Sequence, residues 1–84
     1  MSPGIRNERA GALIHELRVD RGLSPEALSY AIYKAGLGSV SSRTIRRIES
    51  DGMVPRVGNQ FAIAAYFDRK VTSIWEPTAT KVKA

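Results

Sequence analysis

Residues 40–51 read VSSRTIRRIESD, and this stretch decides how the whole chain can fold. Ser41 is a preferred helix N-cap residue, and Val40 and Ile45 stand at the two positions of a hydrophobic staple around it. Because a helix advances by about 100° per residue, Ile45 and Ile48 fall on one side and the polar residues occupy the rest. The stretch therefore predicts a short helix that two isoleucines anchor on an apolar core.

The outward side of this helix concentrates positive charge. Arg43, Arg46 and Arg47 stand close together with no acid among them, and like charges at this spacing repel by roughly a few tenths of a kcal/mol per pair. We expect these three arginines to be unpaired. Thirteen Lys and Arg against eight Asp and Glu give the chain a net charge of +5. A solvated charged face is the alternative, but clustered unpaired arginines favour an anionic partner, usually nucleic acid.

Two helices are expected before this one. The first runs from about Arg6 to Arg21 and ends at Gly22, a residue suited to a left-handed helix stop, because its apolar residues recur at helical spacing at Ala10, Leu13, Ile14 and Leu17. The second begins strongly at Ser24, where an N-cap serine is followed by a proline and then by an acid. It extends to about Ala35.

Two shorter helices are expected after it. The spacing of apolar residues predicts a fourth helix whose buried stripe is Val57, Phe61, Ala64 and Phe67. Residues 72–75 predict a fifth, in which Ile74 and Trp75 close the core before Pro77 ends it. No segment alternates as a strand would. The prediction is an all-α, compact five-helix bundle, with one domain over residues 1–76 and a flexible tail over residues 77–84.

Composition excludes several classes of chemistry. The chain has no cysteine and one histidine, His15, so we expect no metal site. It carries no phosphate-binding glycine loop and no evident catalytic triad or carboxylate pair, so we expect no enzyme, no cofactor and no small-molecule ligand. The longest apolar run, residues 61–67, is too short to span a membrane, and the first residues lack a secretory signal. We expect a cytoplasmic protein without membrane contact.

The order and most spacings of these segments resemble the helix-turn-helix family of Xre-type regulators and phage Cro and repressor proteins. The resemblance rests on ALIHELRVDRGLSPEAL (12–28), VSSRTIRRIE (40–49), the glycine and proline of 52–55, and FAIAAYFDRKVTSIW (61–75). It implies a lambda repressor-like fold and a transcriptional regulator. Such a protein would bind double-stranded operator DNA as a homodimer and insert the helix at about 41–50 into the major groove.

The resemblance also implies roles for single residues. The positions that face base edges are Ser42, Arg43, Arg46 and Arg47. Arg43 is our first candidate for bidentate contact with a guanine and Arg47 the second, whereas Arg46 could reach a phosphate instead. The positions that hold DNA phosphates are Ser24, Ser50, Arg56 and Asn59. Arg18 and Glu49 correspond to a structural pair that clamps the recognition helix, and the alternative for Glu49 is an exposed acid.

Two departures from the family pattern leave alternatives open. Pro25 replaces a glutamine that many members carry after the capping serine, so a phosphate contact there would weaken or shift to Ser24. Residues 33–39 are inserted before the recognition helix, either as an extra helical turn or as a loop. Tyr30 and Tyr33 stand where the family has polar or small residues. We expect them to pack in the core, and a partner surface is the alternative.

The alternative function is a protein-interaction module of antitoxin or antirepressor type, with secondary or no DNA binding. In that case Tyr30 and Tyr33 would contact another protein, and an inserted loop that covers residues 41–50 would favour it. A third hypothesis is a basic domain that binds nucleic acid without sequence preference. The lack of an aromatic stacking platform argues against RNA as its ligand.

Overall fold

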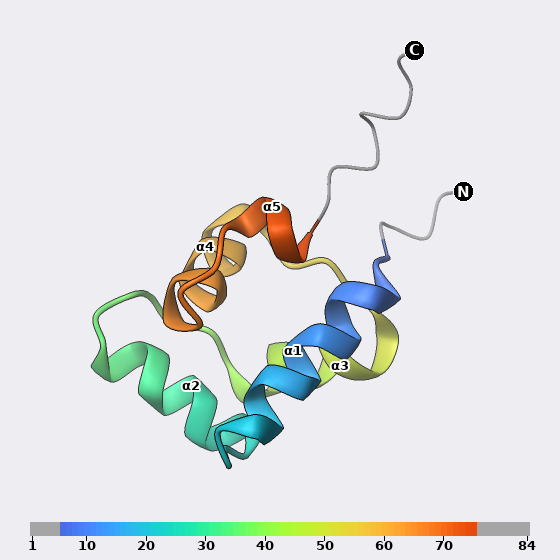
Figure 1. The fold of residues 1–84 in the computed structure, drawn as a ribbon. Helices are drawn as coiled ribbons and strands as arrows, with labels where there is room; N and C mark the ends of the chain where they lie inside the picture. The colour runs from blue at the N-terminus through green and yellow to red at the C-terminus, as the bar shows by residue number, and fades with distance from the viewer. Residues whose placement is uncertain (1–5, 76–84) are drawn as a thin grey trace.

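The computed structural model describes residues 6–75, and the predicted tail at 77–84 lies outside this range. Five helices follow one another: α1 (Glu8–Asp20), α2 (Pro25–Lys34), α3 (Ser42–Asp51), α4 (Val57–Tyr66) and α5 (Val71–Ile74). Figure 1 shows α1 and α3 together on one side of the molecule and α4 and α5 together on another, with α2 in contact with both α3 and α4. Within residues 6–75 there is no strand, which confirms the prediction of an all-α bundle.

Local capping sets the starts of the first three helices. The side chains of Asn7, Ser24 and Ser41 each accept a hydrogen bond from the backbone N–H three residues later, at Ala10, Ala27 and Thr44. These bonds satisfy N–H groups that have no partner inside the helix. The two predicted serine caps are therefore confirmed. Arg56 precedes α4 without a side-chain cap, as its residue type predicts.

Residues 33–39, which the resemblance treats as an insertion, form the end of α2 and a loop. Tyr33 and Lys34 complete α2, and the backbone then leaves the helix through Gly36, whose φ is 75°. The far end of the loop is held by Ser29, whose hydroxyl donates a 2.6 Å hydrogen bond to the carbonyl of Val40. The segment 33–39 therefore lies partly in α2, at Tyr33 and Lys34, and mostly in the loop of residues 35–41.

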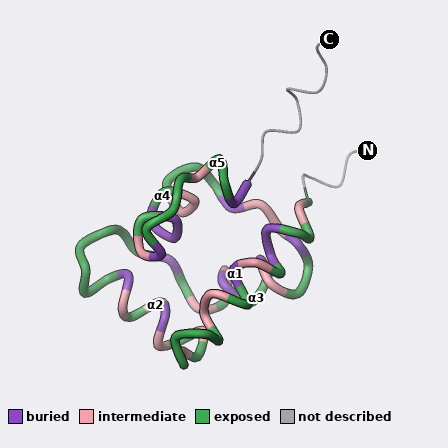
Figure 2. Tube along the Cα trace, in the orientation of Figure 1, coloured by how far each residue is buried: buried purple, intermediate pink, exposed green. Residues whose placement is uncertain are grey.

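A single apolar core joins all five helices, shown in purple in Figure 2. Val40, Ile45 and Ile48 are fully or almost fully buried, as the opening stretch predicts, and Ile74 and Trp75 are buried as well. Burying one aliphatic side chain of this size stabilises a fold by about 1.5–3 kcal/mol. The isoleucines of α3 therefore fix this helix firmly on α1 and α2.

Gly11 lets α1 and α3 approach closely. A Cβ atom at this position would lie 2.2 Å from the carbonyl oxygen of Ile48, well inside any allowed contact. At the end of α3, Gly52 takes a left-handed conformation with φ 71°, and its carbonyl accepts a 2.7 Å hydrogen bond from the N–H of Asn7. Both contacts tie α3 to the start of α1.

Two predictions about burial are wrong. In α4, Ala64 and Phe67 are buried as predicted, but Val57 and Phe61 are exposed, and Ala62 and Ile63 complete the inward side. Residues 61–67 are apolar on every side, so the spacing fitted more than one stripe. Tyr30 and Tyr33 also face solvent, with 62% and 66% of their surface exposed, because Leu28 and Ile32 form the inward side of α2.

Candidate nucleic-acid interface

The outward side of α3 is basic and open to solvent. Arg43, Arg46 and Arg47 are all exposed, whereas Ile45 and Ile48 on the opposite side have no exposed surface. The residues of the inserted loop do not bury these arginines. Ser42, the first residue of the helix, is half-buried. The helix therefore presents the guanidinium groups of Arg43, Arg46 and Arg47, which we call the arginine ridge, on the side opposite its buried isoleucines.

The expectation that all three arginines are unpaired is wrong for two of them. The Nη2 atom of Arg46 contacts the Oε2 atom of Glu26, which lies in the first turn of α2. The Nε atom of Arg47 lies 4.0 Å from Oδ2 of Asp51, one turn further along α3. The acid that balances Arg46 comes from another helix, so the sequence of α3 alone did not reveal it.

Arg43 has a different environment from its two neighbours. Within the part of the chain that the structure describes, its side chain makes no ion pair and no hydrogen bond. It stands in the first turn of α3, at the end of the helix where the backbone N–H groups also point outward. A guanidinium group in this place is free to bind an anion or a base edge.

Arg18 and Glu49 form the pair that the resemblance implies. Nε of Arg18 donates to Oε2 of Glu49 and Nη2 donates to Oε1, each over 2.7 Å, while Nη1 donates to the carbonyl of Leu23 over 2.7 Å. Only 11% and 10% of the two side chains is exposed. The alternative of an exposed acid at Glu49 is therefore wrong. The pair joins α1, the turn before α2 and α3.

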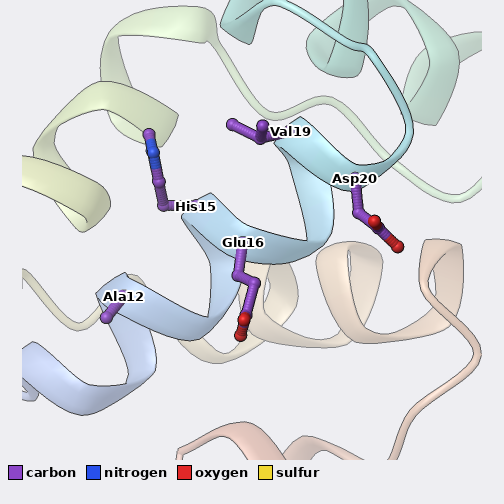
Figure 3. Close-up of a pocket in the computed structure, with 5 residues that line it drawn as sticks. All are labelled: Ala12, His15, Glu16, Val19 and Asp20. Carbon is purple, nitrogen blue, oxygen red and sulfur yellow. The ribbon is translucent and has the colours of Figure 1, made fainter.

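His15 also belongs to this cluster, although sequence reasoning gave it no role. Its Nδ1 atom lies 2.8 Å from Oε1 of Glu49 and 3.1 Å from Nη2 of Arg18. Figure 3 shows its ring directed away from Glu16 and Asp20, the acids on the other side of α1. The spacing of His15 and Arg18, three residues apart on one helix, was the only signal in the sequence.

The ionisation of these groups follows from their partners. Burial raises the pKa of Glu49, but the hydrogen bonds from Arg18 and His15 outweigh it, and the net pKa lies below the ordinary value. The hydrogen bond to Glu49 raises the pKa of Arg18. The hydrogen bond from Arg46 likewise lowers the pKa of Glu26. Glu49, Arg18 and Glu26 are therefore charged at neutral pH.

The predicted phosphate-binding residues are spread around α3. Ser24 and Ser50 are exposed, and their hydroxyls are already bonded, the first to the N–H of Ala27 and the second to Oδ1 of Asp51. Arg56 is exposed at the start of α4, and Asn59 is half-buried. A surface hollow of about 470 Å³ brings together His15, Arg18, Pro25, Arg46, Glu49 and Ser50. The start of α2 and the arginine ridge therefore lie at the same hollow.

Two other features are absent from residues 6–75. This part of the chain holds no cluster of three or more His, Asp or Glu side chains that could bind a metal ion. None of its helices has the length and apolar character needed to cross a membrane. In comparisons of the sequence and the structure with known proteins, no protein family, no curated protein and no solved structure matches.

Proposed function

We propose that this protein is a sequence-specific regulator that binds double-stranded operator DNA through α3. The observation that carries the proposal is the outward arginine ridge on a helix that two fully buried isoleucines and the pair of Arg18 and Glu49 hold in place. A rigid convex helix of this kind fits the width of the major groove. The helix order and the resemblance to Cro and repressor proteins support the same function.

Within this proposal some side chains contact bases and others contact phosphates. Arg43 reads a guanine through its two parallel N–H donors, and Arg47 reads a second base. Ser42 precedes Arg43 in the first turn of α3 and contacts a base edge as well. Arg46 lies near the hollow beside α2, where a DNA phosphate has to compete with Glu26 for its guanidinium group. Further phosphate contacts come from Ser24, Ser50, Arg56 and Asn59. The binding unit is a homodimer on two half-sites about one helical turn, roughly 34 Å, apart.

Selection of bound sequences from a pool of random duplexes tests the proposal. We expect enrichment of a palindrome, and a mass measurement of the complex should give two chains per site. In the selected site, Arg43→Ala should cost about 1–3 kcal/mol at one base pair and relax the preference there. Arg56→Ala should weaken binding to all sequences alike. It should also reduce the slope of log affinity against log salt concentration by about 0.9, the value for one phosphate contact.

Two outcomes would overturn these assignments. If no sequence is enriched although the protein binds duplexes, the binding is not specific and the regulator function fails. If Arg43→Ala and Arg56→Ala weaken every sequence equally, the protein binds DNA but the roles of the two arginines are wrong.

The exposure of Tyr30 and Tyr33 favours a second candidate, a protein-interaction module. Both rings lie on the outer side of α2, and Nζ of Lys34 sits 6.0 Å from the centre of the Tyr30 ring. Tyrosines are enriched in protein interfaces. The site selection separates the two functions, because an interaction module without DNA binding enriches no sequence and shifts no duplex in a gel.

A further inference from the structure

The contact between Glu26 and Arg46 lies on the surface that we propose for DNA. Glu26 stands in the first turn of α2, where the helix dipole favours a negative carboxylate, and Arg46 stands in the middle of α3. Of the two side chains, 59% of Glu26 and 54% of Arg46 is exposed. The pair is therefore open to water, and it would also be open to a phosphate group.

A carboxylate at this place resembles a phosphate in what it offers to an arginine. Both are anions with several acceptor oxygens, and both suit the fork of the guanidinium group. One nitrogen of Arg46 is already bonded to Glu26. A DNA phosphate that approaches the same guanidinium must either displace the carboxylate or lie close to it, and two anions side by side repel each other.

Resting on the proposed function, we propose that Glu26 is a positioning residue that limits the affinity for DNA by competing with the phosphate backbone for Arg46. Glu26 holds Arg46 beside the start of α2, so Arg46 contributes little to phosphate binding in the natural protein. Arg43, which has no such partner in residues 6–75, is left as the free cation of the ridge. A moderate affinity for any DNA lets a regulator leave non-operator sites, where binding depends almost entirely on phosphates.

The slope of log affinity against log salt concentration measures this competition. Each phosphate that a protein neutralises adds about 0.9 to the slope on duplex DNA. In Glu26→Gln the freed Arg46 should take up one phosphate. On a random duplex we expect tighter binding at low salt and a slope steeper by about 0.9, which is about a threefold to fourfold larger loss of affinity between 50 and 200 mM salt.

Glu16→Gln is the matched control. Glu16 is an exposed acid on α1, and the substitution changes the net charge by the same amount without touching Arg46. It should leave the slope of the natural protein almost unchanged, because diffuse charge alone adds no phosphate contact. Thermal unfolding checks that each variant is folded before its binding is compared.

Arg46→Gln completes the test as a double-mutant cycle. In the natural background this change should alter the slope little, since Arg46 is taken up by Glu26. In the Glu26→Gln background it should remove the additional 0.9. Without DNA, the carboxyl pKa of Glu26, followed by NMR, should rise when Arg46 is replaced.

The outcomes distinguish this inference from the function on which it rests. If neither the natural protein nor any variant binds a duplex, both the regulator function and the role of Glu26 are refuted. Should the protein bind while Glu26→Gln and Glu16→Gln give equal slopes, only the role of Glu26 is refuted. The same holds if Arg46→Gln lowers the slope equally in both backgrounds.

Discussion

Arg18 and Glu49 join α1 to α3 through two parallel hydrogen bonds of 2.7 Å each, at a site where about nine-tenths of both side chains is covered. The remaining guanidinium nitrogen, Nη1, binds the carbonyl of Leu23 just before α2. One side chain thus fixes three segments relative to one another. The orientation of the arginine ridge depends on this pair as well as on Ile45 and Ile48.

Glu49→Gln should destabilise the fold by about 1–3 kcal/mol, because it leaves the largely buried guanidinium of Arg18 without a charged partner. Urea unfolding followed by the fluorescence of Trp75, the single tryptophan, measures the change. Glu16→Gln on the exposed side of α1 serves as the control and should stay within about 0.5 kcal/mol. Equal effects of the two variants would show that the pair adds no stability.

The contribution of the pair should depend on pH in a defined direction. Because the pKa of Glu49 is lowered in the folded chain, its stabilisation is complete above the pKa of the unfolded chain, about 4.3, and is lost as pH falls through the lower folded value. The stability difference between the natural protein and Glu49→Gln should therefore shrink as pH falls below about 4. A difference that persists unchanged at pH 3 would contradict this linkage.

Gly11→Ala should destabilise the protein, although alanine favours a helix by up to about 1 kcal/mol over glycine. The new Cβ would meet the Ile48 carbonyl at 2.2 Å, so α1 and α3 must move apart at a cost of about 1–3 kcal/mol or more. Gly58→Ala is the counterpart, because it lies in α4 with nothing within 4 Å of the added atom, and it should be neutral or stabilising. Thermal unfolding of both variants tests the close approach of the two helices.

The exposed face of α4 gives a further test. Phe61 is 59% exposed, so Phe61→Gln should change stability by less than about 1 kcal/mol. Ile63, two residues later, has no exposed surface, and Ile63→Ala should cost about 2–5 kcal/mol. The originally predicted stripe through Val57 and Phe61 requires the reverse order, so comparing the two variants by urea unfolding decides which side of α4 faces the core.

Much of the fold follows from signals within one helical turn. Ser24 and Ser41 start their helices as predicted because a capping side chain and the N–H that it accepts from are three residues apart. Ile45 and Ile48 are buried as predicted because the rest of α3 is polar and leaves one apolar side. Where a segment is apolar all round, as in residues 61–67, periodicity placed Ala64 and Phe67 correctly but not Phe61.

In the candidate site, too, features set within one helix were predictable and contacts between helices were not. The sequence by itself determined that α3 forms, that its isoleucines face inward and that its arginines face outward, since those outcomes depend on neighbours along one helix. Only the tertiary structure decided which charged side chains meet across helices: Glu26 lies 20 residues before Arg46, and His15 lies 34 residues before Glu49. Ion pairs between helices depend on how those helices pack, and packing brings together residues that no local pattern connects.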